Sequence, residues 1–332
     1  SGKEFIQPSK LANVFQLLHE EGREMSAWQI GKILSTNELL KPDRIEILER
    51  GSVRSIVQIS HRFNESTFIQ NVIVYHNLPR IDFPCTVDWR EIGTRETGSR
   101  FLKVAFPLNI SPESEATFEI PFGTIQREAN GHEYPSQKWL DLSDEDFGVS
   151  LVNDCKYGCD VDQNVMRLSL LRCSYEPDPV PDKGMHHVAY AIVPHQGNWK
   201  SANTLKAGYE LNQALIPMLT DQHQGHFPLS RPFVSCSAEN VMITALKKCA
   251  NDGTLILRCY ETQGKSSDVT FRFSFNVLHI RETDLLERDL ENSSTGVKDN
   301  CFNVGICPYE IRTFRITREA FQWQKRHNFV PV

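Results

Sequence analysis

Apolar and polar side chains alternate with a period of two along much of this chain. In the stretch TFEIPF, the large apolar residues Phe118, Ile120 and Phe122 alternate with their neighbours. Successive side chains of a β-strand point to opposite faces, so this stretch predicts a strand with one apolar face. Similar runs lie at residues 53–60, 67–75, 85–89, 102–106, 165–171, 187–193, 241–246, 254–260 and 269–277. Short strands in such number, separated by Gly, Pro, Asn and Asp, predict an all-β fold built as antiparallel sandwiches.

Helical periodicity is scarce by comparison. Residues 10–21 and 201–215 come closest to a 3.6-residue spacing of apolar side chains, and residues 283–290 predict a short turn. A boundary between domains is predicted near residues 228–237, where two prolines interrupt the alternation. We therefore expect a large β-sandwich at residues 1–232, a small β-sandwich at residues 233–332, and few short helices.

Polar side chains gather in the segment 147–195, at the ends of two strand-like apolar runs, 149–152 and 165–171. The residues that follow these runs are Asn153, Asp154, Lys156, Tyr157, Tyr175, Asp178 and Asp182. Binding and catalytic groups are often displayed on such loops, because the strands hold the loops in place. A hairpin loop that satisfies its own polar groups is the alternative interpretation.

Composition and charge restrict the class of protein. At 332 residues the chain can form about two domains with a substantial core. A net charge of −6, without any Lys/Arg-rich run, argues against binding to nucleic acid. No apolar stretch approaches the ~20 residues of a membrane span, and the N-terminal SGKEFIQPSK has no export pattern. Nine scattered cysteines without a CxxC pair are typical of a reduced, cytoplasmic protein.

Catalytic motifs are weak. The P-loop, dinucleotide, G-x-S-x-G and H-E-x-x-H patterns do not occur. The run Asp221-Gln-His223-Gln-Gly-His226 could offer metal ligands, although histidines in such a loop are more often solvated. An acidic cluster precedes Phe147, and glycoside hydrolysis requires two carboxyl groups, but neighbouring acids in a turn are usually solvated or capping. The acids of that cluster are Asp141, Asp144, Glu145 and Asp146.

A resemblance to a known family is carried by long segments in the same order. GVSLVNDCKYGCD, then MRLSLLR, and then PDPVPDKGMHHVAYAIVPHQGNW resemble the C-terminal β-domain of glycoside hydrolase family 38 α-mannosidases, in particular the cytosolic, vacuolar and bacterial branch. AFPLNISPESEATFEIPFGTIQRE, EYPSQKWLDLSD and PYEIRTFRI also fit, so the resemblance covers nearly the whole chain.

The resemblance implies a galactose-mutarotase-like sandwich, with catalysis located elsewhere. In this family the N-terminal α/β domain holds one divalent metal, zinc or cobalt, through Asp and His ligands, and supplies the Asp nucleophile of a retaining mechanism. Those segments are not found in this chain. We therefore expect it to be the C-terminal region of an α-mannosidase, without catalytic or metal-binding residues and inactive alone.

The implied partners are the protein's own N-terminal catalytic domain and mannosides or other oligosaccharides. Five residues would face that domain and either contact substrate hydroxyls or pack in the interface. They are Asn153, Asp154, Lys156, Tyr157 and Arg172. Strand edges left exposed would favour pairing with another copy as a homo-oligomer.

The sequence departs from the family pattern in the segment MSAWQIGK. Ser26 and Gln29 stand where relatives typically carry Asp, so an interdomain salt bridge that depends on those acids is not expected here. Cys173 replaces a small or polar residue. Two alternatives stay open beside the mannosidase interpretation: a stand-alone carbohydrate-binding module, and a self-sufficient hydrolase that uses residues 141–146 or 221–226.

Overall fold

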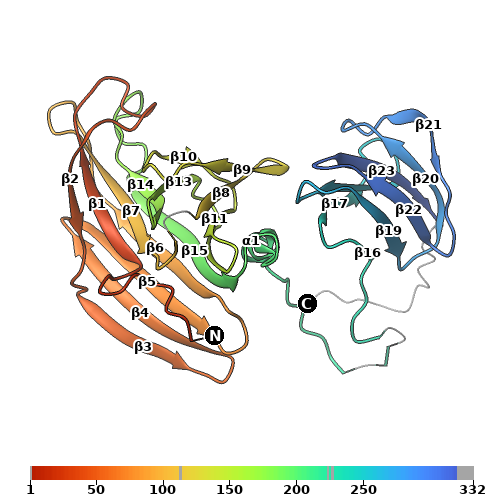
Figure 1. The fold of residues 1–332 in the computed structure, drawn as a ribbon, viewed down its shortest axis with the longest axis horizontal. Coiled ribbons are helices and arrows are strands. Elements are labelled where there is room, and N and C mark those ends of the chain that lie inside the picture. Colours follow the sequence, from red (N-terminus) through yellow and green to blue (C-terminus); the bar gives the residue numbers. More distant parts are fainter. Residues whose placement is uncertain (1, 112–113, 223, 226–227, 320–332) are drawn as a thin grey trace. The chain divides into compact units, whose positions relative to one another are not determined.

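The protein divides into two compact units, Ser1–Pro217 and Met218–Val332. The computed structural model describes residues 2–111, 114–222, 224–225 and 228–319. Figure 1 shows that both units are built from antiparallel sheets, which confirms the predicted all-β fold. The boundary expected after residue 232 lies 15 residues beyond this division, just before β16 (Val234–Cys236), the first strand of the small unit.

The large unit contains two sheets. Its six-stranded sheet has the order β10 (Tyr134–Pro135), β13 (Gly158–Asp162), β14 (Val165–Arg172), β7 (Ser99–Pro107), β1 (Val14–Glu20) and β2 (Ile33–Glu38). Its nine-stranded sheet has the order β3 (Arg44–Arg50), β4 (Arg54–Phe63), β5 (Ser66–Tyr75), β6 (Ile81–Trp89), β15 (Gly184–Gln196), β12 (Phe147–Asn153), β11 (Trp139–Ser143), β8 (Glu115–Ile120) and β9 (Gly123–Arg127).

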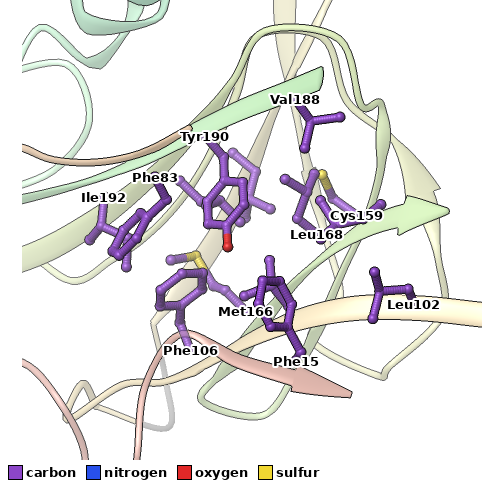
Figure 2. Close-up of a cluster of buried hydrophobic side chains, with 14 of the residues drawn as sticks. Phe15, Phe83, Leu102, Phe106, Cys159, Met166, Leu168, Val188, Tyr190 and Ile192 are labelled. Carbon is purple, nitrogen blue, oxygen red and sulfur yellow. The ribbon is translucent and has the colours of Figure 1, made fainter. Parts of the chain in front are cut away.

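The core of the large unit lies between these two sheets. Figure 2 shows Phe15 and Phe106 from the six-stranded sheet meeting Phe83 and Tyr190 from the nine-stranded sheet. The rings of Phe83 and Tyr190 stack with centroids 5.3 Å apart. Each fully buried aromatic side chain stabilises the fold by ~1.5–3 kcal/mol, so this layer fixes how the two sheets pack.

The small unit is also a two-sheet sandwich with its own core. Its sheets have the orders β16, β19 (Ser267–Phe273), β22 (Cys301–Ile306), and β17 (Val241–Lys248), β18 (Leu255–Glu261), β23 (Ile311–Arg318), β20 (Val277–Thr283), β21 (Asp289–Thr295). Phe271 stacks on Phe302 with ring centroids 5.1 Å apart, between the sheets. The run 269–277, expected as one strand, is divided between β19 and β20.

One helix, α1 (Thr204–Asn212), confirms the helix expected within residues 201–215. It packs against β12, β11 and β15. Gly208 permits this contact, because a Cβ at that position would lie 3.0 Å from Cδ1 of Trp139. In the described part of the chain, no helix combines the length and the apolar character needed to cross a membrane.

Two local expectations were wrong. Residues 10–21 were expected to be helical, but Val14–Glu20 forms strand β1. This strand is buried on both faces, so its apolar side chains do not alternate with polar ones. Their spacing therefore resembles that of a helix. Phe122 was expected on the apolar face with Phe118, but it lies in the turn between β8 and β9, with φ of 57° and 41% exposure.

Candidate functional site

The outer face of the six-stranded sheet carries charged and aromatic side chains instead of a core. On β7, Leu102 and Val104 point into the core, so the alternating residues Phe101 and Lys103 point to the outer face. Lys103 is nevertheless only 5% exposed. A lysine is almost never buried to this extent unless it is paired, which directs attention to its partners.

Lys103 belongs to a buried group of four charges. Its Nζ lies 2.5 Å from Glu133 Oε2 and 2.6 Å from Asp160 Oδ2. Arg167 Nε donates to the other oxygen of Asp160 at 2.5 Å. Ser169 donates its hydroxyl to Glu133 at 2.7 Å. Lys103, Asp160 and Arg167 lie on β7, β13 and β14, and Glu133 lies just before β10. Arg167 also lies 3.4 Å from Asp162, so the two cations are paired with carboxylates on all sides.

The segment that follows β1, residues 21–32, forms a loop beside this group, and we call it the Trp28 loop. Ser26 is buried, and its Oγ accepts the backbone N–H groups of Tyr175 and Glu176 at 2.9 and 3.0 Å. Glu176 in return accepts the N–H of Met25 at 2.7 Å. A serine hydroxyl therefore serves as the acceptor for two backbone N–H groups in this loop. The loop is fixed by these bonds although Trp28 itself is 74% exposed.

A groove of about 970 Å³ lies over the outer face of the sheet, and we call it the outer groove. The Trp28 loop borders it on one side and Tyr157 borders it on another, while Phe101, Lys103 and Arg167 lie along its floor. A smaller hollow of about 360 Å³ extends from it toward Lys156. Ligand sites typically have volumes of ~300–1,000 Å³ and combine aromatic walls with a few polar groups, and the outer groove has both properties.

Asn153 and Asp154 use their side chains inside the sandwich. Asn153 is 1% exposed, donates to the carbonyl of Gln137 at 2.9 Å and accepts the N–H of Lys156 at 3.0 Å. Asp154 accepts the N–H of Ala189 at 3.0 Å. These contacts fix the turn after β12. The side chains of Lys156 and Tyr157 then extend from this turn to the protein surface. Tyr157 is 55% exposed.

Arg172 is also held within the large unit. Its Nε and Nη2 donate to the two oxygens of Glu20 at 2.8 and 2.6 Å, and Nη2 donates to the carbonyl of Gln29 at 2.9 Å. Burial alone would raise the pKa of Glu20, but hydrogen bonds from Arg172, Gly31 and Ser99 outweigh it, and the pKa is lowered. Arg172 therefore anchors the Trp28 loop to the sheet.

The remaining polar residues of the segment 147–195 have local roles. Tyr175 donates its hydroxyl to the carbonyl of Arg23 at 2.8 Å and accepts the N–H of the same residue at 2.7 Å. Asp178 accepts the N–H of Val180 at 2.9 Å, as in a turn. Asp182 borders the smaller hollow.

The acidic cluster before Phe147 is used within the fold. Asp141 is fully buried, with Oδ1 accepting from Ser143 at 2.5 Å and Oδ2 lying 2.7 Å from both Ser150 Oγ and His195 Nε2. Asp144 accepts the N–H of Phe147 at 2.8 Å. These bonds fit a structural role better than a pair of catalytic acids.

His223 and His226, from the other candidate cluster, lie outside the described residues. Across the part of the chain that the structure describes, no group of three or more His, Cys, Asp and Glu side chains is arranged to hold a metal ion.

Three residues of the outer groove were missed by the sequence interpretation: Trp28, Lys103 and Glu133. A signal existed for Lys103, since it is a single charge within the apolar strand FLKVAF. No local signal marks Trp28 or Glu133, because the packing of the loops over the sheet decides their exposure.

Comparison with known families gives the assignment. The profile of the glycosyl hydrolases family 38 C-terminal domain matches residues 1–180. The chain belongs to glycosyl hydrolase family 38. The profile of the family 38 C-terminal beta sandwich domain matches residues 240–314, in the small unit. The predicted resemblance is thereby confirmed.

Individual α-mannosidases match this chain over most of its length. Alpha-mannosidase 2C1 of Mus musculus is 31% identical over 96% of this chain, and Alpha-mannosidase G of Dictyostelium discoideum is 32% identical over 81% of it. The chain spans only 31% and 26% of these two relatives. An α-mannosidase structure from Enterococcus faecalis V583 shares the fold, with a TM-score of 0.73, 14% identity, and coverage of 92% of this chain and 38% of that one.

Proposed function

We propose that this chain is the non-catalytic C-terminal region of an α-mannosidase that hydrolyses terminal α-D-mannosides with retention of configuration. The nucleophile and the divalent metal, zinc or cobalt, belong in this proposal to an N-terminal catalytic domain outside the chain. The observation that carries it is the match over 96% of this chain to about a third of one α-mannosidase, 31% of its length. The whole chain thus corresponds to one region of such an enzyme.

The contacts of the predicted site residues support a non-catalytic role. Asn153 and Asp154 hold the turn after β12, and Arg172 holds Glu20. Breaking buried hydrogen bonds costs free energy, so side chains that form them are poorly suited to act in catalysis. Lys156 and Tyr157 border the hollow beside the outer groove, so they are available to a substrate hydroxyl or to the catalytic domain.

A cytoplasmic location is part of the proposal. All nine cysteines are free, and five of them are buried: Cys85, Cys159, Cys173, Cys249 and Cys259. Burial raises the pKa of Cys85 to about 12, so this thiol behaves as a small apolar side chain. Free thiols in this number are typical of proteins in a reducing compartment.

The proposal is tested by complementation. The catalytic region of a family 38 α-mannosidase is assayed on a chromogenic α-mannoside, alone and after fusion to this chain. The fusion is expected to be more active or more stable to heat than the catalytic region alone. A fusion to an unrelated β-sandwich of similar size serves as the control. Equal activity and equal stability of the two fusions would contradict the proposal.

A second candidate function is favoured by one observation. A stand-alone carbohydrate-binding module would need an exposed aromatic side chain beside hydrogen-bonding groups, and Trp28 lies at the edge of the outer groove in this way. Such a module would bind saccharides without any catalytic partner.

A further inference from the structure

The exposure of Trp28 is unusual for a residue on so well fixed a loop. The other tryptophans in the described residues, Trp89, Trp139 and Trp199, are at most 7% exposed, whereas Trp28 is 74% exposed. The backbone N–H of Ala27 donates to Glu176 at 3.0 Å, and that of Trp28 donates to Met25 at 3.1 Å. Because this backbone is already ordered in the folded protein, the binding of a ligand to the indole would cost little additional loop entropy.

The charged groups on the floor of the outer groove are paired with one another. Lys103 and Arg167 pair with Glu133 and Asp160, and Arg167 also lies 3.4 Å from Asp162. Within the described residues, Glu133 Oε1, Trp28 Nε1 and the Tyr157 hydroxyl have no hydrogen-bond partner. A groove of this kind would not select an anion or a cation by charge.

Gly158 makes the position of Glu133 possible. A Cβ on Gly158 would lie 2.4 Å from Glu133 Oε1 and 3.2 Å from Ser169 Cβ. The carboxylate therefore lies against the backbone of Gly158, the first residue of β13, with one oxygen bonded to Lys103 and Ser169. Carboxylates held in this way form charge-assisted hydrogen bonds to hydroxyl groups, which are stronger than neutral ones.

We propose that the outer groove binds a neutral oligosaccharide. A sugar ring stacks through its C–H face on Trp28, and its hydroxyls bond to Glu133 and Tyr157. The pairing of the charges on the floor, the aromatic wall and the volume of about 970 Å³ all fit this class of ligand. The choice of a mannoside within this class rests on the function proposed above.

The test is a calorimetric titration of the full chain with α-linked mannotriose, with maltotriose as a second neutral probe. We expect a dissociation constant in the millimolar range for mannotriose. Trp28→Ala should weaken binding at least about tenfold, and Trp28→Phe should retain most of it, because stacking is restored. Phe122→Ala, which removes an exposed aromatic side chain outside the groove, should leave binding unchanged. Binding of neither sugar, or full binding by Trp28→Ala, would overturn the proposal.

A second variant tests the floor of the groove. Glu133→Gln keeps the shape of the side chain and removes its charge, so it should weaken sugar binding about tenfold. The thermal midpoint of each variant is measured in parallel, and affinities are compared between variants that melt as the parent chain does. Should Glu133→Gln lower the midpoint, Tyr157→Phe, which removes only an exposed hydroxyl, replaces it. Undiminished affinity in a well-folded Glu133→Gln or Tyr157→Phe variant would contradict the hydrogen bonds assigned to these two side chains. Failure of this titration leaves the complementation result unaffected, so the two proposals fail separately.

Discussion

Arg172 on β14 holds Glu20 on β1 through two parallel hydrogen bonds, at 2.8 and 2.6 Å. Glu20 also accepts the backbone N–H of Gly31 at 2.5 Å and the hydroxyl of Ser99 at 2.7 Å. β7 lies between β1 and β14 in the sheet, so the pair spans a strand. Through Gly31, and through the carbonyl of Gln29, it also positions the Trp28 loop.

Replacing Arg172 by Met should destabilise the large unit by ~3–5 kcal/mol, because Glu20 would be left as a buried charge without its partner. Denaturant unfolding followed by circular dichroism measures this. Arg44→Met is the matched control, since Arg44 pairs with Glu46 on an exposed strand and should contribute no more than ~1 kcal/mol. Equal unfolding midpoints for the two variants would contradict the role assigned to Arg172.

Acid should weaken the same pair. Glu20 has a pKa below its ordinary value of 4.5, so the unfolded chain binds its proton more readily than the folded chain. The stabilisation is complete above pH 4.5 and is lost as the pH falls through the folded pKa. The difference in unfolding free energy between the parent chain and Glu20→Gln should therefore narrow on acidification. A difference that stays constant from pH 7 to pH 3 would exclude this contribution.

Substitutions of Lys156 and Tyr157 should affect enzyme kinetics, whereas substitution of Asn153 should affect stability. In a full-length enzyme that carries this chain, Asn153→Ala removes the acceptor for the N–H of Lys156 and should lower stability by ~1–3 kcal/mol. Lys156→Ala and Tyr157→Ala should instead alter KM or kcat while the melting temperature changes little. Unchanged KM and kcat with lowered stability in both variants would place these side chains in a structural interface.

Gly148 on β12 should not tolerate a side chain. A Cβ there would lie 2.3 Å from His195 Cε1 and 2.4 Å from Ser143 Cβ, in the buried network around Asp141. Gly148→Ala should cost ~1–3 kcal/mol, through overpacking. Gly253→Ala, with no atom within 4 Å of the added Cβ, is the control and should be close to neutral. Thermal denaturation of both variants measures this difference in stability, and equal melting temperatures for the two variants would contradict the prediction.

The sequence predicted the fold class well and some strands poorly, for a physical reason. Strands with one exposed face, such as β5, keep the alternation that marks them. β1 is buried on both faces, and its pattern therefore resembles a helix. In the exposed strand β3, none of the residues is fully buried, so no buried face marks this strand in the sequence. The burial of β1 and of β3 depends on how the sheets pack, and the local sequence pattern does not contain this information.

The sequence marked only one segment that borders the outer groove. The loop 153–157 was located because polar residues follow an apolar strand. Trp28, however, is more than a hundred residues away from this loop in the sequence, and only the packing of its loop on Tyr175 and Glu176 brings it beside Tyr157. Sequence reasoning also did not find the partner of Arg172, because Glu20 lies 152 residues away in the chain.

Whether catalysis lies outside this chain is measured most directly by an assay of the chain alone on a chromogenic α-mannoside, with and without added zinc or cobalt. Because the nucleophile and the metal are proposed to lie outside the chain, we expect no hydrolysis above the buffer rate under either condition. The same assay with a full-length family 38 α-mannosidase shows that the conditions support turnover. Hydrolysis that co-purifies with the isolated chain would contradict the account.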